Sequence, residues 1–364
     1  MKSAMIHAFT DDPHDISIMD VPRPNPGPGE VRVRMLLSAV HPADLNYLRG
    51  TYYRALERVI WNQARPADDP GVYFDPARRV TCPAPPYALG LEGVGIVEAC
   101  GAGLQARRLL GKRVVVAGGP PCGTWQEHVV VAARRAFPLP VTIPDEQAAM
   151  FLANSISVVA MVHDVLRVKR GSRLLVTAAG SALGKDIVRL GRREGFRTIC
   201  VVRSDANSAE LLELGSDAVI DTSRQDLVRE IARLTDGHGV EFALDCVGGD
   251  LASMAVRCLA AGGHLLVYGT LSDDPMCVPS RDLMMPNARV TGFYLGNWIA
   301  RQSPLRLLSV LRRVRRLSTE GVFRAAVADV FPLENVVQAV AAAMTPGRTG
   351  KILLRIGSAP PARA

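Results

Sequence analysis

The stretch RLLVTAAGSALGKDIVRLGRREGFRTICVVRSD, residues 173–205, decides the fold. Its opening segment, 173–179, is apolar and predicts a buried strand. Residues 181–195 follow as a helix, and residues 197–203 form a second strand. The helix has an apolar face made of Leu183, Ile187 and Leu190. A strand, a helix and a strand in this order predict a βαβ unit and therefore a parallel sheet.

The turn between the first strand and the helix reads AAGSALG, residues 178–184. In dinucleotide-binding folds this turn is rich in glycine, because the backbone approaches a pyrophosphate and the helix packs closely on the strand. Gly180 and Gly184 stand here among small residues. The N-terminus of the helix offers N–H groups and a positive dipole to phosphate. The turn predicts a dinucleotide site; the alternative is a tight turn that binds no ligand.

The end of the second strand, VVRSDAN (201–207), bears on which dinucleotide binds. Proteins that bind NAD usually place an acidic residue here, about 20 residues after the glycine turn, for the ribose 2′-hydroxyl. Arg203 stands at that point, and a guanidinium suits a 2′-phosphate, so NADPH is favoured. Asp205 leaves a ribose contact open, and Arg203 could also be a solvated strand end.

The rest of the chain predicts an α/β protein with two domains. Further strands are predicted at 217–221, 240–248, 263–270 and 289–296. Residues 145–167 contain no proline or glycine and predict one helix. We expect a doubly wound dinucleotide-binding domain at 144–299, and a β-rich second domain made of 1–143 and 300–364.

Composition limits the functional classes. The 364 residues are 48% hydrophobic and 21% charged, which excludes disorder as the main state. The net charge of +8 is not gathered in a basic tail, so we do not predict nucleic-acid binding. The seven cysteines have no close spacing, which predicts neither a disulfide framework nor a zinc knuckle. Without a signal-peptide core or a long apolar run, we expect a cytoplasmic protein that does not bind membranes.

Five motifs along the chain carry a family resemblance. They are GEVRVR (29–34), HPADLN (41–46), PYALGLEGVG (86–95), the glycine turn, and TGKILL (349–354). Together they resemble the medium-chain dehydrogenase/reductase superfamily over nearly the whole chain. The resemblance implies a Rossmann domain and a GroES-like catalytic domain, the latter being the β-rich part.

The alcohol-dehydrogenase branch of that superfamily holds a zinc ion, and this sequence departs from its ligand pattern. There a cysteine, the histidine of a Gly-His-Glu triplet and a further cysteine or acid bind the metal. Here the first position falls around Val40 and His41, and the triplet reads Gly90-Leu91-Glu92. Zinc needs four such ligands, or three and a water. We therefore predict a reductase without zinc, in which His41 is structural.

Three segments point to a branch within the superfamily. Residues 41–52, 242–269 and 292–298 resemble the mitochondrial-type 2-enoyl thioester reductases of fatty-acid synthesis. The first two segments are partly shared with quinone oxidoreductases. The resemblance implies NADPH-dependent hydride transfer to the β-carbon of an enoyl-CoA or enoyl-acyl-carrier-protein, in a homodimer.

The same resemblance assigns site residues. The catalytic tyrosine falls on Tyr52, with Tyr53 as a one-residue alternative, and Asn46 is a second catalytic candidate. A phenol can stabilise the enolate or help to protonate the α-carbon; the other interpretation of Tyr52 is a packed aromatic. The cofactor contacts implied are Asn154, Gly180, Ser181, Ala182, Leu183, Arg203, Ser204, Asp205, Tyr268, Gly269, Thr270, Leu271, Phe293, Tyr294, Leu295 and Lys351.

Two features are not explained by the resemblance. An insertion at about 54–85 follows the predicted tyrosine, and we expect it to border the substrate; the alternative is a surface loop without substrate contact. The helix at 304–320 is rich in arginine. It could attract coenzyme A phosphates or an acidic carrier protein, although such a run is more often a solvated face.

Two other functions remain open at this point. One is an NADPH-dependent quinone or enone oxidoreductase on the same fold, in which Tyr52 only frames the nicotinamide. The other is a protein that binds NADPH without catalysis. Turnover of an enoyl thioester or of a quinone separates these possibilities.

Overall fold

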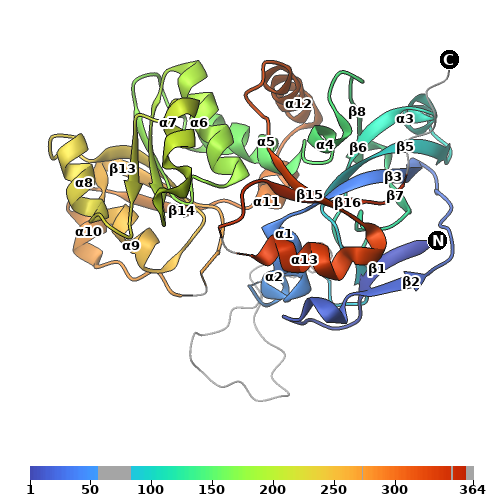
Figure 1. The fold of residues 1–364 in the computed structure, drawn as a ribbon. Coiled ribbons are helices and arrows are strands. Elements are labelled where there is room, and N and C mark those ends of the chain that lie inside the picture. The colour runs from blue at the N-terminus through green and yellow to red at the C-terminus, as the bar shows by residue number, and fades with distance from the viewer. Residues whose placement is uncertain (56–82, 273, 346, 358–364) are drawn as a thin grey trace. The chain divides into compact units, whose positions relative to one another are not determined.

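The structure is a computed structural model that describes residues 1–55, 83–272, 274–345 and 347–357. The chain forms two compact units (Figure 1). The first, unit 1, is Met1–Leu152 with Val327–Ala364, and the second, unit 2, is Ala153–Ala326.

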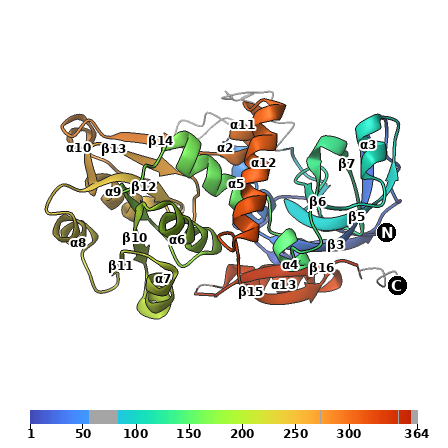
Figure 2. The same ribbon diagram turned by 90° about the horizontal axis from the view of Figure 1, so that it is seen from above.

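Unit 2 is built on a six-stranded parallel sheet in the order β11-β10-β9-β12-β13-β14. Figure 2 labels the strands of this sheet except β9. Numbered from its first strand, this is the order 3-2-1-4-5-6 of the Rossmann fold. The strands are β9 (Arg173–Val176), β10 (Arg197–Val202), β11 (Ala218–Asp221), β12 (Val240–Asp245), β13 (Leu259–Val267) and β14 (Arg289–Gly292). The predicted α/β class and the parallel sheet are confirmed.

Helices cover this sheet because their apolar stripes need burial. Helix α6 packs on β10, and α9 packs on β12 and β13. One core cluster joins α8 and α9 to the sheet through Ile231, Val256, Val201 and Leu265. The helices are α5 (Ala153–Val159), α6 (Ala182–Glu194), α7 (Ser208–Leu214), α8 (Leu227–Leu234), α9 (Gly249–Arg257), α10 (Ser280–Met284), α11 (Leu295–Ala300) and α12 (Pro304–Thr319), with a π-helical turn η4 (Ala160–Val165) and a 3₁₀ turn η5 (Asp205–Asn207).

Unit 1 is β-rich. Its seven-stranded sheet has the order β15-β16-β3-β5-β6-β8, and β7 pairs with β3. A three-stranded sheet has the order β2-β1-β4. The strands are β1 (Lys2–Ile6), β2 (Ser17–Asp20), β3 (Glu30–Val40), β4 (Tyr87–Ala88), β5 (Glu92–Cys100), β6 (Arg113–Ala117), β7 (His128–Ala132), β8 (Ala136–Pro138), β15 (Val327–Pro332) and β16 (Lys351–Arg355).

Short helices surround these sheets. Helix α13 lies against β15 and β16 (Figure 1) and buries Val336 and Val340 in the core around the fully buried Trp125. The helices are α1 (Pro42–Leu48), α2 (Thr51–Ala55), α3 (Leu104–Leu109), α4 (Asp145–Ala148) and α13 (Val336–Met344), with 3₁₀ turns η1 (Pro13–Asp15), η3 (Ala133–Arg135) and η6 (Leu333–Asn335).

The prediction of one helix over 145–167 is wrong. The structure has α4, a buried turn, α5 and the π-helical η4 instead. In the turn, the backbone N–H of Leu152 donates a 2.6 Å hydrogen bond to Glu92 Oε2. That N–H is therefore lost to any helical ladder, and its partner is a distant residue that the local sequence cannot reveal.

The structure also groups the end of the chain differently from the predicted domain limits. Residues 300–326 lie in unit 2, because α12 packs against α5 there and buries Val310, Val314 and Leu317. Most of the predicted 54–85 insertion, residues 56–82, lies outside the described residues.

Candidate functional site

The turn between β9 and α6 is shaped by its glycines. A Cβ added at Gly184 would lie 2.5 Å from the carbonyl oxygen of Ala179, so only glycine allows the helix to approach the strand this closely. Ser181 caps the helix, its Oγ accepting a 3.1 Å hydrogen bond from the Gly184 N–H. A Cβ at Gly180 would lie 3.0 Å from the amide of Asn207. The result is a narrow turn at a helix N-terminus, which suits a phosphate.

The loops that follow the parallel strands gather at the same edge of the unit 2 sheet. Backbone hydrogen bonds join them: Ala179 N–H to the Val201 carbonyl at 3.1 Å, and Phe293 N–H to the Val267 carbonyl at 2.8 Å. The edge therefore brings together the predicted cofactor segments 180–183, 203–205, 268–271 and 293–295. In open α/β sheets, ligands bind at this carboxyl edge.

The predicted 2′-phosphate contact lies at the end of β10. Arg203 is exposed, and within the described part of the chain its guanidinium has no hydrogen bond or ion pair. Asp205 instead pairs with Arg224, with 3.0 Å between Oδ2 and the guanidinium. The acid that left a ribose contact open is thus held by a cation.

Two buried residues of this edge were missed by the sequence analysis. Thr177 Oγ1 donates a 2.7 Å hydrogen bond to Asp245 Oδ1, and the Gly248 N–H donates to Asp245 Oδ2 at 2.8 Å. Burial raises the pKa of Asp245, although these hydrogen bonds oppose the rise. The pair ties the ends of β9 and β12 together on either side of the point where the strand order reverses. An acidic residue that directly ends an apolar strand is the signal that could have identified it.

Tyr268 and Asn154 differ from the other predicted cofactor residues in their surroundings. The hydroxyl of Tyr268 is buried, and this burial, with Cys246 beside it, raises the pKa of the phenol well above its usual value. Its backbone N–H donates to the Asp245 carbonyl at 2.8 Å. Asn154 lies in the first turn of α5, away from the strand-end loops in the sequence. Both contacts stay predictions.

The predicted catalytic residues belong to unit 1. Asn46 lies in α1 and Tyr52 in α2, and both side chains are half-buried. The ring of Tyr52 packs edge-on against the ring of Tyr47, with 5.0 Å between centroids. The Tyr47 carbonyl accepts a 3.0 Å hydrogen bond from the Tyr87 hydroxyl, which fixes the end of α1.

A cluster of buried polar side chains lies around His41, the residue before α1. Lys351 Nζ lies 3.1 Å from His41 Nδ1, and His41 Nε2 lies 2.9 Å from Glu92 Oε1. Lys351 is thus buried beside His41, and its predicted cofactor contact stays a prediction. Among the described residues, no three His, Cys, Asp or Glu side chains are grouped to hold a metal ion. Both nitrogens of His41 face other side chains, so the residues present do not fit zinc.

Asp44 gives the cluster a pH dependence. Asp44 Oδ2 accepts a 2.8 Å hydrogen bond from the backbone N–H of His41. Burial raises the pKa of Asp44 to about 7. The folded chain therefore holds a proton that the unfolded chain loses above its usual pKa, and stability falls as pH rises toward 7, by up to about 1.4 kcal/mol per pH unit. We expect Asp44→Asn to remove this slope. Melting temperatures of both proteins between pH 5 and 8 test it, and parallel curves would contradict it.

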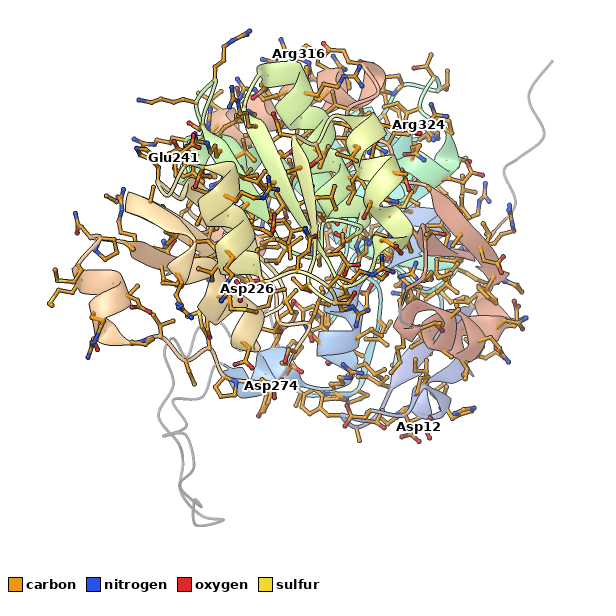
Figure 3. All side chains as sticks on the ribbon, turned by 60° about the vertical axis from the view of Figure 1, so that its left-hand side comes forward. Asp12, Asp226, Glu241, Asp274, Arg316 and Arg324 are labelled. Carbon is orange, nitrogen blue, oxygen red and sulfur yellow. The ribbon has the colours of Figure 1, made fainter. Side chains whose placement is uncertain are left out.

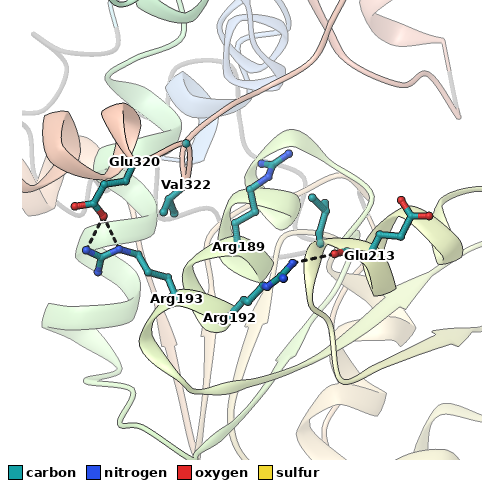
Figure 4. Close-up of a pocket in the computed structure, with 8 residues that line it drawn as sticks. Arg189, Arg192, Arg193, Glu213, Glu320 and Val322 are labelled. Atoms are coloured by element: carbon teal, nitrogen blue, oxygen red, sulfur yellow. Dashed lines mark hydrogen bonds and ion pairs between the residues drawn. The ribbon is translucent and has the colours of Figure 1, made fainter.

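An arginine-lined hollow of about 580 Å³ lies at the far end of α6 from the glycine turn (Figure 4). Arg193 donates to Glu320 at 2.6 Å, and Arg192 donates to the Glu213 carbonyl at 3.2 Å. Arg316 of α12 lies exposed nearby (Figure 3), 3.8 Å from Glu320. Arg192 and Arg193 belong to α6, so this hollow does not test the arginine-rich helix, whose role stays a prediction.

Two family models match the chain. The alcohol dehydrogenase GroES-like domain matches residues 27–141, and the zinc-binding dehydrogenase domain matches residues 182–310. The fold and the glycine turn thus define an oxidoreductase with a Rossmann and a GroES-like domain. The chain belongs to the medium-chain dehydrogenase/reductase superfamily, as its sequence motifs predicted.

The chain is also similar in sequence to individual enzymes of known name. The chain is 26% identical to the mitochondrial enoyl-[acyl-carrier-protein] reductase of Dictyostelium discoideum over 331 residues, which cover 89% of this chain and 86% of the relative. It is also 26% identical to the human enzyme of that name over 331 residues, covering 89% and 80%.

Solved structures give a second comparison. A Bacillus thuringiensis protein assigned as an NADPH:quinone reductase is 30% identical, with a TM-score of 0.84, and covers 98% of this chain and 99% of its own. Escherichia coli quinone oxidoreductase, solved with NADPH, has a TM-score of 0.83 at 22% identity, covering 98% and 100%. At that identity the second likeness shows the fold alone.

Proposed function

We propose that the protein is an NADPH-dependent reductase of 2-enoyl thioesters that acts without zinc. The observation that carries the proposal is the similarity to enoyl-[acyl-carrier-protein] reductases over 89% of the chain. The narrow turn at the N-terminus of α6 supports a dinucleotide, since its glycines leave room for a phosphate beside the backbone.

The choice of NADPH rests on the end of β10. A 2′-phosphate carries charge that Arg203 can meet with two parallel N–H donors. Asp205 would repel that phosphate if it were unpaired, but Arg224 holds it at 3.0 Å. Arg203, Asp205 and Arg224 together carry a net positive charge at the end of β10, which favours the phosphorylated dinucleotide.

We expect Arg203→Ala to raise the Michaelis constant for NADPH at least 10-fold and to leave that for NADH within about 2-fold, because only NADPH presents a phosphate to the lost charge-assisted hydrogen bonds. Steady-state kinetics with both cofactors measure the two constants. Arg224→Ala is a second test, since it releases Asp205 and should weaken the binding of NADPH while sparing that of NADH. Equal changes in the Michaelis constants for NADPH and NADH would contradict a contact between Arg203 and the 2′-phosphate.

The chain's own residues would handle the charge and the proton. NADPH, when bound, supplies the hydride that reduces the β-carbon of the enoyl thioester. Electron density then moves to the thioester oxygen, and the α-carbon takes up a proton to give the saturated thioester. The phenol of Tyr52 donates a hydrogen bond to that oxygen or helps to deliver the α-proton, and Asn46 orients the thioester.

A quinone or enone substrate is the second candidate, favoured by the 30% identity with the Bacillus thuringiensis protein. Assays with crotonyl-CoA and with a simple benzoquinone, each with NADPH, separate the two. We expect crotonyl-CoA to be turned over with the larger kcat/KM. Turnover of quinone alone would overturn the proposal, and tight NADPH binding without turnover of either would favour a non-catalytic protein.

We further propose a homodimer in the cytoplasm. Strand β14 is an outer strand of the unit 2 sheet, and Met284 and Met285 at the end of α10, the helix before it in the chain, are 72% and 76% exposed, which suits contact with a second copy. Among the described residues, no helix is both long and apolar enough to cross a membrane.

A further inference from the structure

The side chain of Thr177 continues the pairing of two strands past the point where their backbones separate. The backbone N–H of Thr177 donates a 3.0 Å hydrogen bond to the Leu244 carbonyl, the last backbone bond that the structure describes between the ends of β9 and β12. Ala178 then has a left-handed φ of 46°, so the chain leaves the extended conformation of the strand. Past this point, the described hydrogen bonds between the two strand ends are those of the Thr177 hydroxyl.

This hydroxyl both donates and accepts. Thr177 Oγ1 donates a 2.7 Å hydrogen bond to Asp245 Oδ1, and it accepts a 3.2 Å hydrogen bond from the Cys246 N–H. The Leu244 carbonyl, at 3.5 Å, is the more distant acceptor for the single hydroxyl proton. Thr177 and Asp245 are both 0% exposed. Loss of the hydroxyl would therefore leave a buried carboxylate oxygen without this donor and without water in its place.

Asp245 also holds the loops that follow β12 and β13. Its Oδ2 accepts the Gly248 N–H at 2.8 Å, and its carbonyl accepts the Tyr268 N–H at 2.8 Å. The carbonyl of the next residue, Cys246, accepts the Leu271 N–H at 3.0 Å. The two loops of this half of the sheet are therefore joined to each other through Asp245 and its neighbour.

Other contacts hold the loops of the first half, which follow β9 and β10. The Ala179 N–H donates a 3.1 Å hydrogen bond to the Val201 carbonyl, and Ser181 caps α6. The glycine turn and the strand end that carries Arg203 thus have contacts of their own. In a Rossmann fold each half of the sheet binds one mononucleotide, and a dinucleotide crosses the point where the strand order reverses. That point lies between β9 and β12.

We propose that Thr177 and Asp245 are positioning residues that fix the two mononucleotide-binding halves of unit 2 relative to each other. An intact dinucleotide needs their hydrogen bond, because it must contact both halves at once. A ligand that fills the first half alone does not need it. Without the bond, part of the binding free energy of NADPH is used to bring the two halves into place. The inference rests on NADPH as the cofactor and not on the reduction of a thioester.

Calorimetric titration of the apoprotein tests the proposal with two ligands. One is NADPH, and the other is adenosine 2′,5′-bisphosphate, which is the phosphorylated adenosine half of NADPH. We expect Thr177→Val to raise the dissociation constant for NADPH about 10-fold or more, and that for the bisphosphate less than about 2-fold. Thr177→Ser keeps the hydroxyl, so both of its constants should stay within about 2-fold of the native values.

Thr235→Val is the matched control. Thr235 is also 0% exposed, and its Oγ1 donates to the Ile231 carbonyl at 2.7 Å and accepts the Gly239 N–H at 2.9 Å. It lies between α8 and the start of β12, at the amino edge of the sheet, opposite the loops of the candidate site. We expect this variant to melt at a lower temperature and to bind both ligands as the native protein does.

Asp245→Asn keeps the test decisive where Thr177→Val does not fold. An amide nitrogen cannot accept a hydrogen bond, so one of the two bonds in which the Asp245 oxygens accept from Thr177 and Gly248 is lost. We expect weaker binding of NADPH and unchanged binding of the bisphosphate.

Three results would overturn the proposal: unchanged NADPH binding in the folded variants of this pair, equal weakening of both ligands, or an equal loss of NADPH binding in Thr235→Val. If the native protein binds NADPH and does not reduce crotonyl-CoA, the proposed function fails, while these titrations still decide the role of Thr177 and Asp245.

Discussion

Replacing Gly184 with alanine is expected to raise the dissociation constant for NADPH by about 10- to 100-fold. The added Cβ would lie 2.5 Å from the carbonyl oxygen and 2.7 Å from the Cα of Ala179. Both atoms belong to the backbone, so α6 must move away from β9, at an overpacking cost of about 1–3 kcal/mol. That movement displaces the N-terminus of α6, where the phosphates would bind. Fluorescence titration with NADPH measures the constant.

Gly191→Ala is the matched control for that change. It makes the same substitution in the same helix, at a position that is also closely packed, since its Cβ would lie 2.9 Å from Phe196 Cε2. It lies about 10 Å further along the helix axis, and side-chain atoms can yield there. We expect a lower melting temperature with unchanged NADPH binding. If both variants weakened NADPH equally, the turn would have no special role.

The local pattern of apolar and polar residues was enough to predict the dinucleotide-binding half of the fold. The alternation of apolar strands with a helix over 173–205 depends on contacts between neighbouring segments, and the structure has β9, α6 and β10 there. The glycine turn follows from the same local logic, because a close helix–strand approach requires Gly184. By contrast, the break between α4 and α5 depends on Glu92, 60 residues from Leu152.

In the candidate site, too, the local sequence predicts single residues but not their contacts with distant ones. Arg203 was predicted because it ends a strand, but the ion pair that holds Asp205 needs Arg224, which comes from after the next strand. His41 was predicted to be structural; the structure places it against Glu92 and against Lys351, 310 residues away. Residue types identify which groups can bind charge; only the fold shows which charges meet.

Replacing Tyr52 with phenylalanine is expected to lower kcat for crotonyl-CoA about 10²- to 10³-fold, the usual effect of losing one donor to a developing oxyanion. The ring would still pack on Tyr47 at the same 5.0 Å, so the variant should fold and its dissociation constant for NADPH should not change. Single-turnover oxidation of NADPH isolates the chemical step from product release. An unchanged rate would leave Tyr52 as a packed aromatic.

Tyr53→Phe removes the same hydroxyl one residue later and is the control for register. The ring of Tyr53 packs on Phe9, with 5.2 Å between centroids, so the two tyrosines have different neighbours although both lie in α2. If only Tyr52→Phe lowers the rate, the donor is the residue that the resemblance assigns. If only Tyr53→Phe does so, the mechanism stands with its register moved by one. Losses in neither variant would mean that the oxyanion is stabilised by another donor, and the comparison with enoyl thioester reductases would then extend to the fold and not to the chemistry.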